Sequence, residues 1–573
     1  MSNRPYVMES RFNTTCAECS KPIHKGDNIT KRDIPGKGEK WVHLKCPKGK
    51  RTFKEMISGN GSDHIANAID VETILPQLTT KVFIPSVYQQ AIFDWVVDGT
   101  GNAIVEAVAG SGKTTTIVKS LELIPEHLRI LFLAFNKHIV KELKRRVPSH
   151  IRVSTVHALG MSIIRKLPDF QDLDEDKISG IMDTFWSIRK SEVEDAGIRS
   201  KNRIKRQVMR KIVSLVKATL SDYNDPETIL ELIDLYNIEM DEQDEQEMIE
   251  RLPEIMEINN SNLKYIDFDD MTYLPLIVPS LQNRFDEYDF ILVDEAQDLN
   301  KAGMELIIKC ISKEGRIIAV GDRRQSLYAF RGADAEAIPN LIKRLDAVVL
   351  PLSISYRCPK KHVLSVKSIV PQIEYAENAI EGILEGMPYK DLLKSLKEGD
   401  MVLCRSNAPL IKPAFECIRR GIKAIIKGKD IGRELVNFIE RFQCDELGRL
   451  EIMMAEHTER EITRYIEKGK ELQAEFIKDK FDTILTVAHE CRTVEELTTK
   501  IALLFSDDNA SIVFSSIHKA KGLEAQRIFI LHPELMPHPK AKGDRELTQE
   551  ANAQYVARTR SLSEMYIVTG GEE

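Results

Sequence analysis

Several features that would assign a chain to a specialised class are missing from this sequence. No apolar run is long enough to span a bilayer, and the N-terminus lacks the charged-then-apolar pattern of a secretory signal. Nine cysteines in 573 residues do not make a disulfide framework, and a net charge of −7 argues against a uniformly basic nucleic-acid binder. The composition, 42% hydrophobic and 29% charged, is that of an ordinary soluble protein with several domains. We therefore expect an intracellular, cytoplasmic protein.

Three of the nine cysteines crowd into the first fifty residues, where a metal site accounts for them. The spacing C-x2-C-x23-H-x2-C is formed by Cys16, Cys19, His43 and Cys46. Each pair places two soft ligands on one tight turn, and four such ligands complete a tetrahedral Zn²⁺ site. Metal binding would stabilise a module that has too little core to fold unaided. His24 is the substitute ligand if His43 is not used, and the alternative to a metal site is a coincidental set of reduced thiols.

This zinc module, taken as residues 1–57, is basic although the whole protein is acidic. Residues 1–54 carry thirteen Lys and Arg against five Asp and Glu, a local charge of +8. Such a charge favours contact with a phosphate backbone, and docking onto another protein is the alternative. Residues 58–74 follow as an expected linker, which begins with the flexible stretch SGNGSD.

An apolar strand, a loop of small residues and a helical pattern follow one another between residues 102 and 121. The loop has the pattern Ala107-x4-Gly112-Lys113-Thr114, which is a phosphate loop with Ala in place of the first Gly. Glycines let backbone N–H groups approach phosphate oxygens at a helix N-terminus. The Lys side chain would reach the β- and γ-phosphates, and the Thr hydroxyl would ligate Mg²⁺. The residues expected to bind ATP here are Ala109, Gly110, Ser111, Gly112, Lys113, Thr114 and Thr115.

A second apolar strand ends in a cluster of carboxylates. Residues 290–300 have the sequence FILVDEAQDLN, in which three carboxylates lie within five residues. Like charges this close repel one another unless a cation lies nearby. The phosphate loop accounts for such a cation, because a nucleotide bound there brings Mg²⁺. Asp294 would hold this Mg²⁺, and Glu295 would orient and deprotonate the attacking water. The two stretches together predict an ATPase.

Six stretches occur in the order seen in superfamily 1 helicases. They are AVAGSGKT, DEAQD, GDRRQSLYAFRGA, SYRCP, HKAKGLE and QYVARTR. Over residues 80–573 the chain resembles the UvrD/Rep family, including its F-box helicase relatives, whereas the zinc module lies outside the resemblance. The resemblance implies an ATP-dependent DNA helicase that moves 3′→5′ on single-stranded DNA, uses Mg²⁺ and acts at junctions between single and double strands.

The resemblance also implies further residues around the nucleotide. Gln325 would sense the γ-phosphate, and Arg357 and Arg560 would be arginine fingers from a second lobe. Arg558 ranks second to Arg560 for that role, and each of these arginines could instead be a surface residue. The residues implied for the adenosine part are Tyr356 to stack on adenine, Glu524 for the ribose, and Gln89 for the adenine edge, with Gln90 as its competitor.

Candidate nucleic-acid contacts follow the same order along the chain. Aromatic rings that stack on bases tolerate every base, which suits a motor that must pass all of them. The residues implied by the resemblance are Phe135, Thr155, His157, Tyr328, Phe330, Arg331, Arg405, Asn407 and His518. The alternative for Tyr328 and Phe330 is a place in the hydrophobic core, and the remaining residues could each be structural. RNA is the alternative substrate, because stacking and phosphate contacts discriminate poorly against ribose.

Strands alternate with helical stretches on both sides of the phosphate loop, which predicts an α/β fold of doubly wound parallel sheets. By resemblance these are two RecA-like lobes that hold ATP in the cleft between them. The expected boundaries are 75–160 and 265–350 for the first lobe, 351–430 and 506–573 for the second, and 161–264 and 431–505 for helical insertions. In the first insertion, the basic run at 201–211 could contact duplex, whereas the acidic run at 241–250 favours a solvated helix face.

Two other functions compete with the helicase. One is a single-strand translocase that remodels protein–DNA complexes without much unwinding. The other is a DNA-structure recognition protein led by the zinc module, with an accessory ATPase. No nuclease constellation stands out in the sequence, so nuclease activity would need a partner protein, and a recombination or replication factor is the other kind of partner expected.

Overall fold

The computed structural model describes five short strands within residues 7–43 and the chain from 83 to 570, apart from 135, 190, 237, 239, 241, 327–335, 468 and 507–509. Two compact units, Met1–Ile84 and Pro85–Glu573, divide the chain. Among the described helices, none combines the length and the apolar composition that a membrane crossing requires.

The first unit contains antiparallel strands. A three-stranded sheet has the order β1 (Val7–Glu9), β4 (Asn28–Ile34) and β5 (Gly38–His43), and a separate pair joins β2 (Thr14–Thr15) to β3 (Pro22–Ile23). Cys16, Cys19 and Cys46 lie outside the described residues, and His43 is known only as the last residue of β5. The zinc site therefore stays a prediction.

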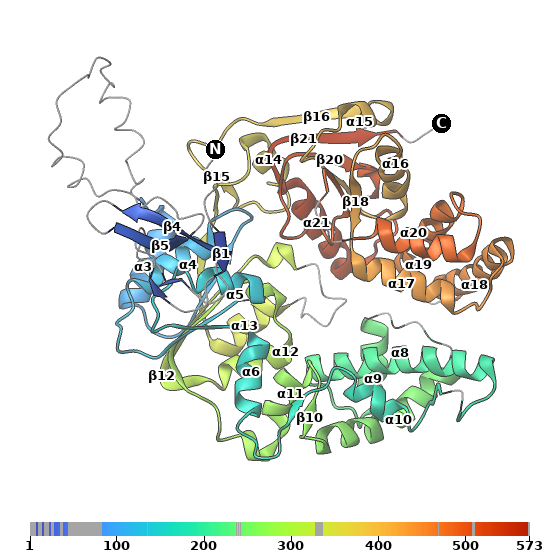
Figure 1. The fold of residues 1–573 in the computed structure, drawn as a ribbon, viewed down its shortest axis with the longest axis horizontal. Helices are drawn as coiled ribbons and strands as arrows, with labels where there is room; N and C mark the ends of the chain where they lie inside the picture. The colour runs from blue at the N-terminus through green and yellow to red at the C-terminus, as the bar shows by residue number, and fades with distance from the viewer. Residues whose placement is uncertain are drawn as a thin grey trace. The chain divides into compact units, whose positions relative to one another are not determined.

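The second unit is α/β and begins with a six-stranded parallel sheet. In spatial order its strands are β13 (Val348–Leu352), β6 (Ala103–Ala107), β12 (Ile311–Gly321), β11 (Tyr288–Val293), β7 (Ile130–Leu133) and β8 (Arg152–Ser154). The central strands are buried on both faces, which explains their continuous apolar sequences. Figure 1 shows this sheet with helices on either side.

Residues of the first sheet alternate between two cores, as period-two strands require. The helices around this sheet are α3 (Val87–Asp98), α4 (Lys113–Leu121), α5 (Lys137–Leu143), α6 (Val156–Ile164), α11 (Asp270–Ile277), α12 (Lys301–Ile308) and α13 (Ala337–Leu345). Phe290 and Leu292 pack with the core that contains α3 and α4, whereas Ile291 and Val293 face the core that contains α6, α11 and α12. The sheet is therefore doubly wound.

A second parallel sheet of six strands forms the other half of this unit. Its spatial order is β16 (Ile383–Pro388), β21 (Ser561–Thr569), β20 (Ala525–Leu531), β17 (Met401–Cys404), β19 (Ile512–Ser516) and β18 (Ala424–Lys427). Its helices are α14 (Lys360–Ser365), α15 (Tyr389–Ser395), α16 (Ala408–Arg419) and α21 (Gly543–Arg558). A two-stranded pair, β14 (Ile354–Ser355) with β15 (Glu374–Tyr375), follows the connection from the first sheet. The α/β prediction is confirmed by both sheets.

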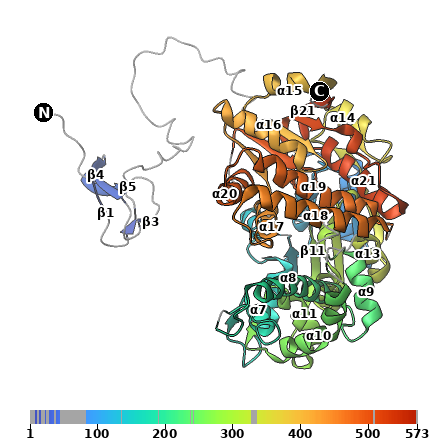
Figure 2. The same ribbon diagram turned by 90° about the vertical axis from the view of Figure 1, so that its right-hand side faces the viewer.

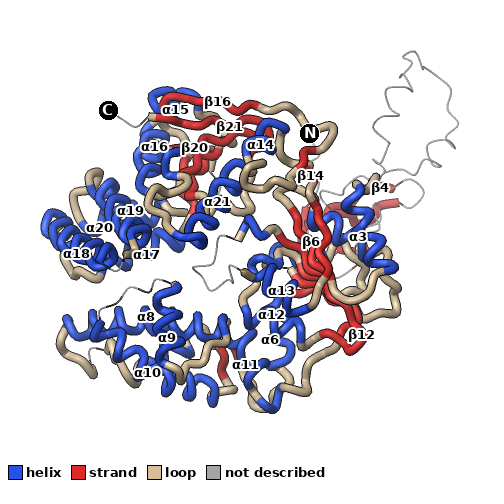
Figure 3. The backbone as a smooth tube through the Cα atoms, turned by 180° about the vertical axis from the view of Figure 1, so that it is seen from behind, coloured by secondary structure: helices blue, strands red, loops and turns tan. Residues whose placement is uncertain are grey.

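Two all-helical segments interrupt the sheets, as the blue tubes of Figure 3 show. The first contains α7 (Lys177–Met182), α8 (Ala196–Thr219), α9 (Pro226–Leu235) and α10 (Glu242–Ser261), and the short strands β9 (Asp172–Leu173) and β10 (Tyr265–Ile266) pair at its two ends. The second contains α17 (Lys429–Glu440), α18 (Leu447–Glu467), α19 (Glu471–Ala488) and α20 (Val494–Leu504). In Figure 2, α18 and α19 lie beside each other in the second segment.

A buried ion network joins the first helical segment to the first sheet's helices. Lys217 Nζ lies 2.6 Å from Asp267 Oδ2 and 2.8 Å from Asp270 Oδ1, and Lys177 Nζ lies 2.6 Å from Asp270 Oδ2. The side chains of Lys177, Lys217 and Asp270 are at most 1% exposed. Asn259 completes the network by accepting from Lys217 and donating to Asp270. Two ammonium groups thus share two carboxylates away from water.

Asp270→Ala is expected to destabilise the second unit by about 3–5 kcal/mol, because it leaves two buried ammonium groups with one carboxylate. A thermal-unfolding scan of the full chain would detect the change as a lower or separate transition. Glu254→Ala, at an exposed position of α10, is the matched control and should leave the midpoint unchanged. A midpoint for Asp270→Ala equal to that of the control would show that the network is not stabilising.

Candidate active site

The phosphate loop joins the end of β6 to the start of α4. Gly110 and Gly112 have φ values of +73° and +79°, which L side chains rarely adopt. Gly112 is the N-cap of α4, so the first helical N–H groups open toward the loop. The Ser111 hydroxyl is buried and has no hydrogen-bond partner among the described residues. An orphaned hydroxyl inside a cradle of this kind fits a phosphate ligand.

The carboxylates at the end of β11 lie against this loop. Thr114 Oγ1 donates to Asp294 Oδ2 at 2.9 Å, and Lys113 Nζ lies 3.5 Å from Glu295 Oε1. The two oxygen groups predicted to ligate Mg²⁺ are therefore adjacent. Glu295 has a φ of +55°, a strained conformation for a residue with a side chain. In this conformation the carboxylate of Glu295 faces the lysine.

Burial and mutual charge shift the pKa values of these groups. Burial alone would lower the pKa of Lys113, but the nearby carboxylates, Glu295 first, outweigh it and raise that pKa. Burial, and then the charge of Glu295, raise the pKa of Asp294 to about 6. The pKa of Glu295 is lowered although burial opposes the shift, because Lys113 and Lys521 lie nearby. Glu295 is therefore ionised at neutral pH, and a cation beside Asp294 would favour its ionised form too.

A chain of hydrogen bonds leads from Glu295 to the end of β12. The Gln297 amide donates to Glu295 Oε2 at 2.5 Å, and Gln297 Oε1 accepts from the Asp322 N–H at 3.0 Å. Gln325 donates to Asp322 Oδ2 at 2.7 Å and accepts from Arg560 Nη2 at 3.5 Å. Arg560 is 1% exposed and comes from the second sheet's side of the site. Gln325 thus lies between the first sheet and one predicted arginine finger.

The other predicted finger also touches the phosphate loop. A Cβ atom on Gly110 would come within 2.4 Å of Arg357 Cβ, and the Tyr356 N–H donates to the Gly110 carbonyl at 2.9 Å. Arg357 Nε pairs with Glu524 Oε2 at 2.8 Å, and Tyr356 is 51% exposed. The residues predicted for adenosine and for the γ-phosphate therefore gather at one place. Arg558 is directed elsewhere, since it donates to the Ser365 carbonyl at 3.0 Å.

Sequence reasoning missed two contacts that link the sheets at this site. The Tyr555 hydroxyl accepts from the Ala109 N–H at 2.6 Å and donates to Asp322 Oδ2 at 3.0 Å. Lys521 Nζ lies 2.5 Å from Asp298 Oδ1, with the two side chains 9% and 4% exposed. Tyr555, Asp298 and Lys521 each lie inside a recognised stretch (QYVARTR, DEAQD and HKAKGLE). The position of each residue within a recognised stretch could therefore have marked it as a candidate site residue.

The structure distinguishes between the two glutamines of α3. Gln89 is 3% exposed, and its amide donates to Thr116 Oγ1 at 3.0 Å. Its carbonyl oxygen also completes a capping box with Ser86, which fixes the start of the helix. Gln90 instead bonds Asp94 on the surface, at 2.7 Å. Of the pair, Gln89 lies beside the phosphate loop.

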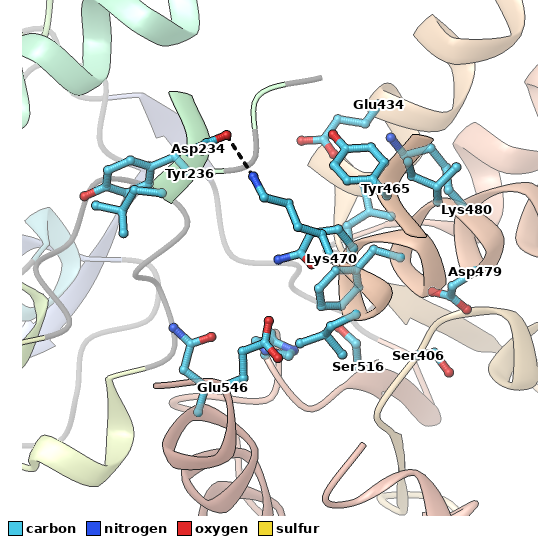
Figure 4. A pocket seen from close by; sticks show the side chains of 18 of the residues that line it. Asp234, Tyr236, Ser406, Glu434, Tyr465, Lys470, Asp479, Lys480, Ser516 and Glu546 are labelled. Carbon is cyan, nitrogen blue, oxygen red and sulfur yellow. Dashed lines mark hydrogen bonds and ion pairs between the residues drawn. The ribbon is translucent and has the colours of Figure 1, made fainter. Parts of the chain in front are cut away.

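Three of the predicted nucleic-acid residues line one cavity of about 1100 Å³. Arg405, Asn407 and His518 lie on its wall, together with residues of both helical segments. Figure 4 shows Lys470 reaching across this cavity to Asp234, an ion pair of 2.8 Å between the two segments. The cavity therefore lies between the second sheet and both all-helical segments.

The remaining nucleic-acid candidates are placed differently. Thr155 caps α6 by accepting from the Ala158 N–H at 3.1 Å, and the His157 ring stacks on Phe268 at 4.1 Å between centroids. Burial lowers the pKa of His157 to about 4, so this imidazole is neutral at pH 7. Neither residue lines the cavity that holds Arg405. Outside the described residues lie Phe135, Tyr328, Phe330 and Arg331.

Comparisons with known proteins find helicases that are similar to this chain. Residues 89–346 match the UvrD/REP helicase N-terminal domain. The chain is 23% identical to F-box DNA helicase protein 1 of Schizosaccharomyces pombe over 518 residues, covering 81% of this chain and 55% of that protein. It is 23% identical to the ATP-dependent DNA helicase PcrA of Staphylococcus aureus over 613 residues, covering 82% and 81% of the two chains. The match to the ATP-dependent DNA helicase Rep of Buchnera aphidicola, 24% identical, covers 52% of this chain and 46% of that one. The chain thus spans about half the length of two of these three relatives and contains a UvrD/Rep-like region.

Affinity for Mg²⁺–nucleotide is expected to depend on pH through Asp294. Above pH 7 the carboxylate is ionised and affinity should be constant, whereas below pH 6 protonation of Asp294 should weaken binding by about tenfold per pH unit. Titration of a fluorescent ADP analogue with Mg²⁺ between pH 5 and 8 measures the effect. Asp294→Asn has no titrating group at this position, so its affinity curve gives the pH dependence that comes from the nucleotide's own phosphates. Parallel pH curves for the two proteins would contradict the assignment.

Proposed function

We propose that the chain is an ATP-dependent DNA helicase that moves along single-stranded DNA, with 3′→5′ polarity. The observation that supports it most is the meeting of an ammonium–carboxylate pair and a hydroxyl–carboxylate pair at one place. Lys113 lies 3.5 Å from Glu295, and Thr114 lies 2.9 Å from Asp294, beside a glycine cradle with an orphaned hydroxyl. The likeness to relatives named as DNA helicases supports the substrate class.

The residues of the site have distinct chemical roles in this proposal. Lys113 and the loop amides would neutralise phosphate oxygens, while Thr114 and Asp294 would hold Mg²⁺. Glu295, whose pKa is lowered, would accept a proton from the attacking water. Arg357 and Arg560 would offset the charge that develops on the γ-phosphate during hydrolysis. Bound Mg²⁺–ATP supplies the phosphoanhydride whose cleavage drives the cycle.

Coupling to movement would use the contacts that cross between the sheets. Tyr555, Lys521 and Arg560 each touch a group of the first sheet that lies next to the phosphate loop or the carboxylates. A change at the γ-phosphate position would therefore alter how the two sheets hold each other. Movement of one sheet relative to the other would reach the cavity that contains Arg405 and His518, because that cavity is built on the second sheet. This is the proposed route from hydrolysis to a step on the strand.

The proposed domain boundaries follow the two sheets and their interruptions. The assignments are a zinc module at 1–57, a linker at 58–74, a RecA-like first lobe at 75–160 and 265–350, a second at 351–430 and 506–573, and helical insertions at 161–264 and 431–505. Support comes from two six-stranded parallel sheets and from helices at both interruptions. The zinc module rests on the cysteine and histidine spacing alone.

Lys113→Ala and Glu295→Gln test the proposed ATPase. The first removes a phosphate-binding charge and should lower strand-stimulated turnover about 10²–10³-fold, and the second removes the base and should lower it about 10²–10⁴-fold. ATP turnover is measured with and without single-stranded DNA, and unwinding is measured on duplexes with 3′ or 5′ tails. Lys119→Ala, at a half-exposed position of α4, is the control and should behave as the wild type. Full activity in either site variant would refute the assignment.

Cys16→Ser tests the zinc module. Loss of one thiolate from a four-ligand site should reduce bound Zn²⁺ from one equivalent toward none, because three ligands hold a structural ion poorly. Metal content of the purified full chain is measured by elemental analysis. Cys444→Ser, at a cysteine between α17 and α18 in the second helical insertion, is the control and should keep the wild-type metal content. Wild-type protein without zinc, after purification free of chelator, would contradict the module.

A further inference from the structure

One face of α19 lines the cavity that contains Arg405, Asn407 and His518. Four of the seven α19 residues that line it are spaced by three, four and three residues, which places these four on a single helix face. They are Gln473, Phe476, Lys480 and Thr483. Figure 4 shows Lys480 and the neighbouring Asp479 on this side of the cavity. The helix belongs to the second insertion, where none of the recognised stretches lies.

Phe476 is an exposed aromatic residue in an otherwise well-packed helix. It keeps 47% of its surface exposed, whereas Ile477 beside it is 6% exposed. The guanidinium of Arg405 lies 5.2 Å from the centre of the Phe476 ring, within cation–π range. Arg405 is itself held by the buried carboxylate of Glu550, with Nη2 2.6 Å from Oε1. A ring beside a fixed cation, with half of its surface open to a cavity, is built to stack on a further flat group.

Three residues of the cavity lining each have a side-chain oxygen without a hydrogen-bond partner among the described residues. Asn407 Oδ1, Gln473 Oε1 and Thr483 Oγ1 are buried and have no hydrogen-bond partner among the described residues. All three residues line the cavity. Burying an unpaired polar atom costs roughly 1–3 kcal/mol, so such atoms indicate a ligand that supplies donors and acceptors. The ligand that the site suits is both flat and polar at its edges.

The nearly balanced charge of the cavity lining favours a ligand that binds by stacking over one that binds by charge attraction. Six Asp and Glu residues and five Lys and Arg residues line the cavity, so its wall is not a cationic groove. Several of the cations are already neutralised, as Lys470 is by Asp234. A bound polyanion would gain little net attraction from such a wall. Contacts with bases must therefore supply much of the affinity.

Helix α19 is fixed to the second sheet's side of the cavity. Asp479 Oδ2 and Oδ1 accept from the N–H groups of Asn407 and Ala408, each at 3.0 Å, at the start of α16. A carboxylate that caps another helix holds its own helix in place. The lining face of α19 therefore keeps its position relative to Arg405 and Asn407.

We propose that α19 forms one wall of the nucleic-acid channel and that Phe476 stacks on a base of the bound strand. This inference rests on the proposed function and adds to it a contact from the second insertion. Gln473, Asn407 and Thr483 would bond the edges of bases as they pass. The insertion then acts on the single strand itself.

Phe476→Ala tests the stacking contact, read out by fluorescence anisotropy with the full chain. The probes are an oligothymidylate of about 16 nucleotides and an abasic strand of the same length. Affinity for the oligothymidylate should fall about 5- to 150-fold, and affinity for the abasic strand should not change, because only the first offers bases. Phe476→Leu should resemble the alanine variant, and Phe476→Trp should restore binding and show quenched indole fluorescence.

Ile452→Ala, at a position of α18 that is 62% exposed and outside the cavity lining, is the matched control and should bind both strands as the wild type. Wild-type affinity for oligothymidylate in the alanine and leucine variants would overturn the stacking role. Equal losses on both strands would also overturn it, because the ring would then only shape the cavity. A wild-type chain that binds neither strand would instead refute the proposed helicase, and this inference with it.

Discussion

The pairing of Lys113 with Glu295 is the interaction on which the rest of this molecule depends. It joins the loop after β6 to the end of β11 at 3.5 Å, and it places one ammonium group near three carboxylates, of which Asp294 and Asp322 are buried and Glu295 is partly buried. Without the lysine, the charges of Asp294, Glu295 and Asp322 would repel one another in a region with little water. The same lysine lowers the pKa of Glu295. The cationic loop and the acidic strand end thus stabilise each other electrostatically even without a ligand.

Three residues from the second sheet's side contact groups around the Lys113–Glu295 pair. Tyr555 reaches the loop and Asp322, Arg560 reaches Gln325, and Lys521 reaches Asp298. Each of these groups is buried, so each contact is made or lost as a unit rather than weakened gradually by water. The hydroxyl of Tyr555 both donates and accepts, which makes it sensitive to the state of two elements at once. A local change at the candidate nucleotide site can therefore alter the contacts between the sheets through Tyr555, Arg560 or Lys521.

The two ends of the candidate site could be predicted from the sequence, because each is a local pattern. The glycines before Lys113 and the apolar run before Asp294 are contiguous in the chain and depend on short-range rules for strands and helix starts. Contacts between distant residues were not predictable in that way. Arg405 pairs with Glu550 across 145 positions, and the choice of Gln89 over Gln90 depends on which one faces Thr116. The face of α19 contains no motif at all, and only packing against α16 reveals it.

The two ends of the first helical insertion lie side by side. Strands β9 and β10 pair directly, with Asp172 opposite Tyr265, so the chain enters and leaves this helical segment at nearly one point. A segment whose two ends lie this close together can be exchanged between homologous proteins without changing the path of the chain in the first sheet. The buried ion pairs restrict such an exchange, because Lys177 and Lys217 lie in the segment whereas Asp267 and Asp270 lie outside it. A segment from another protein would need cations at the matching positions to pair with these carboxylates.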